Sequence, residues 1–287
     1  MRTIATVTAL GLALHVLSGC PASTGPIEED TSCSEDAGDA STFAYPDSGT
    51  PSVALDGRWA MFEVTTATVT IAGSSASENR VTTLLIADQT VDGATVSLTE
   101  EICTIGIENV VGVCGQGSLV TTVIPEAYLA ALPVVTRAGT VSEADGVISY
   151  TLDRLYALRG VKLDNPETDA LPADPNDPAY FDQDGDGKPG MTVRFTEPGI
   201  VKGELYIGQR DWTEFSGEVV AGGRIEGRIT WDSVQQVLGS NPESVALTSP
   251  KSAPHGDPSK SYFVMVRVAD DFDCAALIAA RSELFPN

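Results

Sequence analysis

The residues best suited to chemistry stand together in one short acidic segment. Carboxylates occupy alternate positions at Asp182, Asp184 and Asp186, and Gly187 is the sixth residue counted from Asp182. Calcium takes about six to eight oxygen ligands, and a glycine at the sixth position lets the chain turn sharply so that alternate side chains converge. We therefore expect a structural Ca²⁺ ion, held by these three carboxylates and by the backbone carbonyl of Lys188.

This segment resembles the aspartate loops of EF-hands, dockerins and thrombospondin type 3 repeats. It departs from the EF-hand at the twelfth position, where Val193 replaces the bidentate glutamate, and no flanking helix is evident. Further oxygens are expected from Asp174 and Asp177, with Glu197 as a reserve, and an incomplete loop implies an extracellular-type Kd of roughly 10⁻⁴ to 10⁻³ M. The alternative is a solvated acidic loop whose Asp-Gly pairs only make turns.

The loop lies in a strongly acidic insert, which we expect to cover 161–190. Residues 163–187 contain eight acidic side chains, four prolines and no basic residue. Without a cation, these carboxylates would repel one another and keep the insert mobile.

The charge of the whole chain excludes several classes of partner. Its 287 residues carry 40 acidic and 17 basic side chains, a net charge of −23. Such a chain repels nucleic acid phosphates, so we expect no nucleic acid partner. Five scattered cysteines and two histidines do not form a zinc-finger cluster, and His255 stands alone in a loop, where a catalytic role is not expected.

The N-terminus predicts membrane attachment. An apolar run over 4–17 follows Arg2 and is too short to span a membrane, but it suits a secretory signal. The run ends in Leu17-Ser18-Gly19-Cys20, which resembles the lipobox of bacterial lipoproteins. That resemblance implies removal of residues 1–19 and lipidation of Cys20, with palmitate among the acyl chains; the alternative is an ordinary signal peptide.

Residues 20–52 are expected to form an acidic, flexible tether. The segment 21–52 is rich in Pro, Ser, Thr, Gly, Asp and Glu and contains no lysine or arginine. Removal of residues 1–19 takes away one basic side chain, so the net charge becomes −24. Pro21 after the lipidated cysteine suggests the outer membrane, so we expect a cell-envelope protein on its periplasmic or surface face.

The remaining residues, 53–287, predict a single all-β domain. Short Val-, Thr-, Ile- and Tyr-rich runs alternate with Gly, Asp, Asn and Pro, which favours an antiparallel barrel or sandwich of about ten strands with a C-terminal helix. Strands are expected over 57–71, 80–88, 94–100, 102–110, 117–124, 146–158, 191–197, 200–209, 212–220, 223–231 and 261–269. Hairpin turns are expected at Asp92-Gly93 and Gly222-Gly223. Helices are expected over 125–132, 233–238 and 274–284, the last capped by Asp271 or Asp273.

Three residues resemble the lipocalin and calycin plan. Gly57 and Trp59 open the first strand, as Gly-x-Trp does in that family, and Arg267 stands near the last strand. The resemblance implies that Arg267 packs on Trp59 and that the barrel carries a small apolar ligand. The alternative is that Trp59 only fills a β core.

The cysteines that remain after lipidation allow three pairings in an oxidising envelope. Cys103 and Cys114 flank an expected hairpin, so we predict that they pair. That leaves Cys33 to pair with Cys274.

The expected function is that of a non-enzymatic, calcium-binding interaction module on a membrane-anchored lipoprotein. Its partner would be an envelope protein, a polysaccharide or a small apolar ligand. An empty apolar lumen would favour the calycin-like carrier instead. Less expected are a hydrolase with paired carboxylates and a sugar-stacking face formed by Trp212, Phe215 and Trp231, since core packing is the commoner role of such aromatics.

Overall fold

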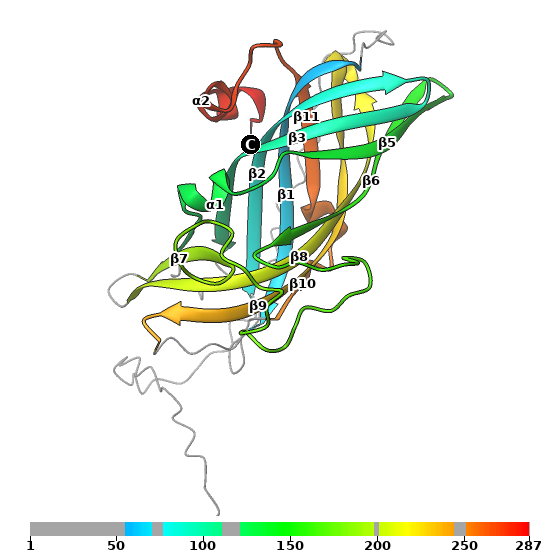
Figure 1. Cartoon of the computed structure of the whole chain (residues 1–287). Helices are drawn as coiled ribbons and strands as arrows, with labels where there is room; N and C mark the ends of the chain where they lie inside the picture. The colour runs from blue at the N-terminus through cyan, green and yellow to red at the C-terminus, as the bar shows by residue number, and fades with distance from the viewer. Residues whose placement is uncertain (1–54, 71–76, 111–120, 198–200, 244–250, 287) are drawn as a thin grey trace, which may run out of the picture. The chain divides into compact units, whose positions relative to one another are not determined.

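The structure, a computed structural model, describes residues 55–70, 77–110, 121–197, 201–243 and 251–286 (Figure 1). Its strands and helices are β1 (Gly57–Thr70), β2 (Ser77–Asp92), β3 (Thr95–Val110), β4 (Thr121–Val123), α1 (Glu126–Ala130), β5 (Val135–Ala144), β6 (Val147–Arg159), β7 (Met191–Glu197), β8 (Val201–Val220), β9 (Arg224–Asn241), β10 (Lys251–Pro254), β11 (Tyr262–Arg267) and α2 (Cys274–Leu284). Two short 3₁₀ turns, Ala221–Gly223 and Pro258–Lys260, join neighbouring strands.

Eight of these strands close a ring, so the fold is a barrel and not a sandwich. The hydrogen-bonded order is β8-β6-β5-β3-β2-β1-β11-β9, and β9 pairs again with β8. Each pairing around this ring is antiparallel. Outside the ring, β7 pairs with the first part of β8, β4 extends β7, and β10 pairs with the end of β1. The predicted all-β antiparallel class is confirmed.

Tight turns explain why sequential strands lie side by side. Gly93 has a φ of 60° between β2 and β3, and Gly222 and Gly223 have φ of 77° and 76° between β8 and β9. Both predicted hairpins are therefore confirmed. A third turn, at Asp145 and Gly146, also has two positive φ values, 54° and 80°, which match the right-handed twist of the flanking strands.

The barrel interior is filled by large side chains. Alternate residues of the strands point inward, and those of β1 begin with Trp59 and Met61, both fully buried. The interior cluster comprises Leu55, Trp59, Met61, Leu85, Ala87, Val96, Leu98, Tyr150, Leu152, Phe215, Ile225, Ile229, Phe263 and Met265. Burying this apolar surface is the main stabilising term of the fold.

A polar network closes the barrel beside Trp59. The carbonyl of Leu55 accepts hydrogen bonds from Trp59 Nε1 at 3.1 Å and from Gln89 Nε2 at 2.7 Å. Tyr150 donates its hydroxyl to Gln89 Oε1 at 2.6 Å. Each buried polar group in this network has a partner, which removes the penalty of leaving it unpaired.

The contact expected between Arg267 and Trp59 is present. The two residues face each other across β1 and β11, and the Arg267 guanidinium lies 5.8 Å from the Trp59 ring centroid. Gly57 is required here, because its φ is +114° and a Cβ at this position would lie 2.1 Å from Arg267 Nη2. Trp59 also fills the core, so both expected roles of this residue are met.

The predicted C-terminal helix is confirmed as α2, which packs on the outside of the barrel (Figure 1). Asp273 caps it by accepting a hydrogen bond from the Ala276 amide at 2.8 Å. Leu277 is fully buried against outward-facing residues of β1 and β2, whereas Ile278 is 50% exposed. None of the helices in the described ranges is both long and apolar enough to cross a membrane.

The helix expected over 233–238 is wrong, because β9 continues through it. Val234, Val237 and Leu238 have the spacing of a helical face. The register between β8 and β9 shifts where Tyr206 pairs with Gly239 and Ile207 with Val237, so Leu238 is an extra residue in a β-bulge. The bulge reproduces a helical spacing within a strand.

Other element boundaries differ as well. The short helix expected over 125–132 is confirmed as α1, but β3 and β8 are each one continuous strand where two were expected. Strands β5 and β10 were missed. The inward positions of β5 include Arg137 and Gly139, which hide its apolar alternation.

Candidate functional site

The aspartate loop lies between β6 and β7 and is organised by its own carboxylates. Asp182 accepts backbone hydrogen bonds from Gly185 at 2.8 Å and from Gly187 at 2.9 Å. Both glycines have positive φ, 73° and 81°, which lets the chain fold around Asp182. The sharp turn predicted at Gly187 is therefore present.

The carboxylates of Asp182, Asp184 and Asp186 converge. Each offers an oxygen that lies within 4.8 Å of the others. Asp184 Oδ1 is buried and has no hydrogen-bond partner. A buried, unpaired carboxylate oxygen is unfavourable, and a cation is one way to satisfy it.

The surroundings of Asp184 disfavour its negative charge. Burial raises the pKa of this carboxyl, and the carboxylates of Asp186 and Asp182 raise it further. The Thr192 amide opposes this effect by donating to Asp184 Oδ2 at 2.9 Å. A divalent cation between the carboxylates would reverse the repulsion and stabilise the charged form.

Thr192 is a member of this site that the sequence did not reveal. Its side chain is 3% exposed, and its hydroxyl donates to Asp186 Oδ2 at 2.6 Å. With its amide on Asp184, Thr192 holds two of the three carboxylates at once. Its position, the eleventh from Asp182, carries no calcium-loop signal that would have identified it.

Gln183 fastens the loop to the barrel. Its Oε1 accepts from the Gly160 amide, next to the end of β6, at 2.7 Å, and its Nε2 donates to the carbonyl of Ala131, at the end of α1, at 3.0 Å. The backbone adds a bond from Phe181 to the Gly160 carbonyl at 3.1 Å. Metal binding in the loop would therefore order a segment that is already joined to α1 and β6.

The other expected ligands do not join the three carboxylates. The group within 4.8 Å, among the residues described, does not include Asp174 or Asp177. Each instead caps its own turn, Asp174 by accepting from the Asn176 amide at 2.9 Å and Asp177 from the Ala179 amide at 2.9 Å. The carbonyl of Lys188 stays a predicted ligand, and the side chain of Glu197 lies outside the described side chains.

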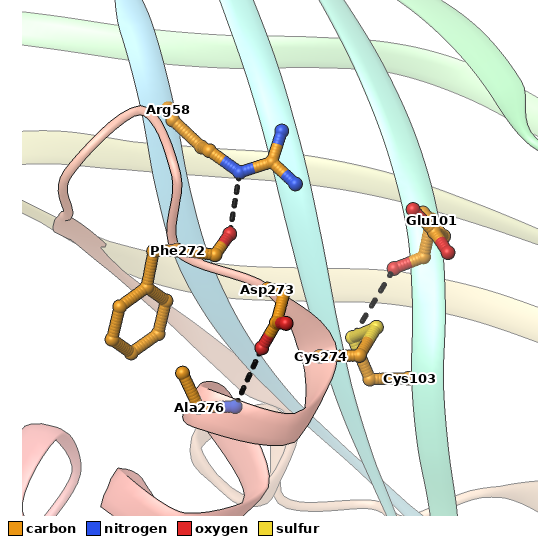
Figure 2. The surroundings of a disulfide bond; sticks show 7 residues. All are labelled: Arg58, Glu101, Cys103, Phe272, Asp273, Cys274 and Ala276. Atoms are coloured by element: carbon orange, nitrogen blue, oxygen red, sulfur yellow. Dashed lines mark hydrogen bonds between the residues drawn. A yellow bond between two sulfur atoms is a disulfide. The ribbon is translucent and has the colours of Figure 1, made fainter.

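The disulfide prediction is wrong, because Cys103 pairs with Cys274 (Figure 2). Each cysteine forms one such bond, so neither pairs with Cys114 or Cys33, and these two lie outside the described residues. Leu84 pairs with Thr104 and Leu85 with Ile102, which makes Cys103 the extra residue of a β-bulge. Cys103 therefore lies on the outer face with α2, whereas Ile105, two residues later, packs against the cluster of Tyr128, Met191 and Ile207.

Five charged residues inside the barrel form a second group that the sequence did not reveal. They are Glu63, Glu100, Arg137, Arg159 and Asp211, contributed by five different strands. A sequence signal existed for one of them, because Glu100 continues the inward alternation of Val96 and Leu98. The other four show no local pattern, since only barrel closure brings them together.

The structure also places His255 and the aromatic residues that were considered as a sugar-stacking face. His255 is 25% exposed, its Nε2 lies 3.6 Å from Glu78, and its Nδ1 accepts from the Asp257 amide, so its ring is held in a turn. Trp212 does not share a face with Trp231 and Phe215. Trp212 pairs with Asp232, one position out of phase with the pairs Thr213–Trp231 and Phe215–Ile229.

The proposed lipidation site, Cys20, lies outside the described residues, as do the signal segment and the tether. A scan of protein-family models and a search of curated proteins found no match to this chain.

Proposed function

We propose that this chain is a membrane-anchored bacterial envelope lipoprotein whose barrel binds calcium and serves as a non-enzymatic interaction module. The observation that carries the calcium part is the unpaired Asp184 Oδ1 among three convergent carboxylates. Oxygen ligands alone suit a hard cation, and the positive φ of Gly185 and Gly187 supports the proposal because it allows the sharp turn that brings alternate carboxylates together.

Asp182, Asp184 and Asp186 would hold the ion, and the proposed role of the ion is structural. Gln183 ties the loop to both Gly160 and Ala131, so an ion that orders the loop also stiffens the attachment of α1. Calcium here neutralises repulsion and fixes a surface segment. A rigid surface suits an interaction module, because the entropy cost of ordering the loop is then met before the partner binds.

The filled interior favours the interaction module over the carrier. Trp59, Tyr150, Phe215 and Phe263 occupy the lumen and are 0–1% exposed. A hollow of about 410 Å³ beside Leu55 is open to solvent and is lined by Leu55, Asp56, Val91, Gly93, Val141, Ser142, Glu143 and Ile148. The closed ring of eight strands and the Arg267–Trp59 contact keep the calycin-like carrier as the second candidate.

The carboxylates inside the barrel give little support to a hydrolase function. Paired carboxylates act on a glycosidic bond that lies between them. Glu100 and Asp211 face guanidinium groups inside the barrel and not an open cleft.

Calorimetric titration with CaCl₂ tests the metal site. Wild type should bind with a Kd on the order of 10⁻⁴ to 10⁻³ M, and Asp184→Asn should lose that heat. Glu167→Gln removes one exposed charge from the same insert and is the matched control. At ten times the Kd, calcium should stabilise the fold by about 1.4 kcal/mol. Equal heats for wild type and Asp184→Asn would eliminate the loop as a metal site.

The anchor is tested separately on the full chain. Wild type expressed in a bacterial host should incorporate a labelled palmitate analogue and sediment with membranes. Cys20→Ser should do neither, and Cys114→Ser should behave as wild type. Unlabelled wild type in the soluble fraction would show that the segment before Cys20 is an ordinary signal peptide.

A further inference from the structure

The charged group inside the barrel contains two ion pairs and one extra carboxyl. Arg137 Nε lies 3.0 Å from Glu100 Oε1, with side-chain exposures of 5% and 6%. Arg137 also donates to the Thr213 hydroxyl at 3.0 Å. Arg159 Nη1 pairs with Asp211. Each guanidinium is thus engaged by its own carboxylate, which leaves Glu63 as the third carboxyl.

Glu63 contributes its carboxyl to this group from β1. It lies two residues after the fully buried Met61 and pairs with Phe263 of β11, which is also fully buried. Its charged neighbours are Glu100 on β3, Arg137 on β5, Arg159 on β6 and Asp211 on β8. The phenols of Tyr128 on α1 and Tyr150 on β6 lie near the same charges and are held neutral by burial, which raises their pKa.

A negative charge on Glu63 is unfavourable in this setting. Burial raises the pKa of Glu63 to about 8, and the carboxylate of Glu100 is the next largest cause, opposed by Arg137. With three carboxyls and two guanidiniums, the interior carries a net charge of −1 unless it takes up one positive charge. A proton on Glu63 makes the group neutral, and neutrality lowers the free energy of a buried site.

We propose that the folded barrel binds one proton at Glu63 at neutral pH, and that the fold weakens as the pH rises towards this range because the unfolded chain has already released that proton. The Arg159 and Asp211 side chains keep 13% and 19% exposure, so water reaches this part of the interior and the proton exchanges with solvent. The barrel is then a pH-responsive element.

The direction of the effect follows from linkage. The folded state holds the Glu63 proton more tightly than the unfolded chain, whose glutamate has an ordinary pKa of 4.5. The contribution of Glu63 to stability is therefore complete below pH 4.5, declines as the pH rises to about 8, and is constant above that value. The folding equilibrium constant should fall by up to about three thousandfold across this window.

Denaturant unfolding of wild type, Glu63→Gln and Glu101→Gln between pH 5 and pH 9.5 tests the proposal. Glutamine mimics the protonated carboxyl, so Glu63→Gln should lose most of the pH dependence. Glu101 is exposed on β3, and Glu101→Gln should keep the wild-type profile. Parallel profiles for wild type and Glu63→Gln would overturn the proposal. A decline of wild-type stability that disappears when KCl replaces another salt at the same ionic strength would also overturn it, because that result would point to a bound alkali cation.

Infrared spectroscopy of the wild type gives a second readout that does not depend on folding of the variant. The carbonyl band of a protonated carboxylic acid should be present in the folded protein at pH 7 and absent above pH 9. Its absence at pH 7 would overturn the proposal.

Discussion

The Cys103–Cys274 bond makes a quantitative prediction about the stability of the whole chain. Its two cysteines are separated by 171 residues, so the loop it closes contains the larger part of the barrel. The chain-entropy relation gives about 5 kcal/mol of stabilisation for a loop of this length. The double variant Cys103→Ser/Cys274→Ser should therefore lose up to about 5 kcal/mol in its free energy of unfolding.

The local effect should be concentrated at α2. Besides the disulfide, this helix is held by a 2.6 Å hydrogen bond from Arg58 to the Phe272 carbonyl (Figure 2). The burial of Leu277 and Phe285 and the position of Arg281 5.3 Å from the Phe62 ring centroid add to this. These contacts are few, so α2 should open before the barrel does. Hydrogen exchange of the α2 amides should accelerate in the variant while that of β1 and β2 changes less.

The assay is denaturant unfolding at fixed pH, without reductant, on three proteins: wild type, Cys103→Ser/Cys274→Ser, and Cys33→Ser/Cys114→Ser. The last variant keeps the observed bond and removes the two cysteines that could exchange with it. It should match wild type within about 0.5 kcal/mol. Equal stability of wild type and the Cys103/Cys274 variant, or an unreduced peptide map linking Cys103 to Cys114, would refute the reasoning.

Three further substitutions, two of them with a matched control, test separate contacts. Gly57→Ala places a Cβ 2.1 Å from Arg267 Nη2 at a φ of +114°, so it should lower the free energy of unfolding by about 1–3 kcal/mol. Gly93→Ala, which has a φ of +60° and open space, should lower it less. Glu100→Gln removes the carboxylate that pairs with the buried Arg137 guanidinium and should cost up to about 3 kcal/mol by the same unfolding assay, with Glu101→Gln nearly neutral. Thr192→Val removes the hydroxyl bond to Asp186 and should weaken calcium binding several-fold in calorimetry; an unchanged Kd would show that Thr192 does not position the loop.

The sequence predicted the fold best where one residue type decides the local structure. Gly93 and the Gly222-Gly223 pair mark turns because they adopt positive φ, and Asp273 marks the start of α2 because its carboxylate caps the helix. The two β-bulges were not predicted. One extra residue at Leu238 gave β9 a helical spacing, and another at Cys103 interrupts the alternation of β3. A β-bulge depends on the pairing with the partner strand, so the local sequence pattern does not predict it.

The site residues likewise include some that local sequence spacing predicted and some that it did not. The carboxylates of the aspartate loop are close in sequence, and their spacing sufficed to predict convergence. Thr192 holds the loop from the second position of β7, where backbone pairing with β8 determines its position. The interior charges come from strands that meet only when the ring closes, as Glu63 and Asp211 are 148 positions apart in the sequence. Barrel closure was one of two architectures open at that stage, so this group was beyond prediction.

Two sets of three carboxylates thus repel one another in this protein, one at the surface and one inside the barrel. On the surface, Asp182, Asp184 and Asp186 repel one another across a loop that water and ions reach, so an incoming cation can relieve the repulsion without any change to the chain. Inside the barrel, the guanidiniums of Arg137 and Arg159 are part of the fold and pair with the carboxyls of Glu100 and Asp211. A further guanidinium would have to displace buried side chains such as Phe263 and Met61, whereas a proton needs almost no space. A proton that exchanges with the water in this part of the interior therefore balances the third carboxyl, Glu63, without a change in packing.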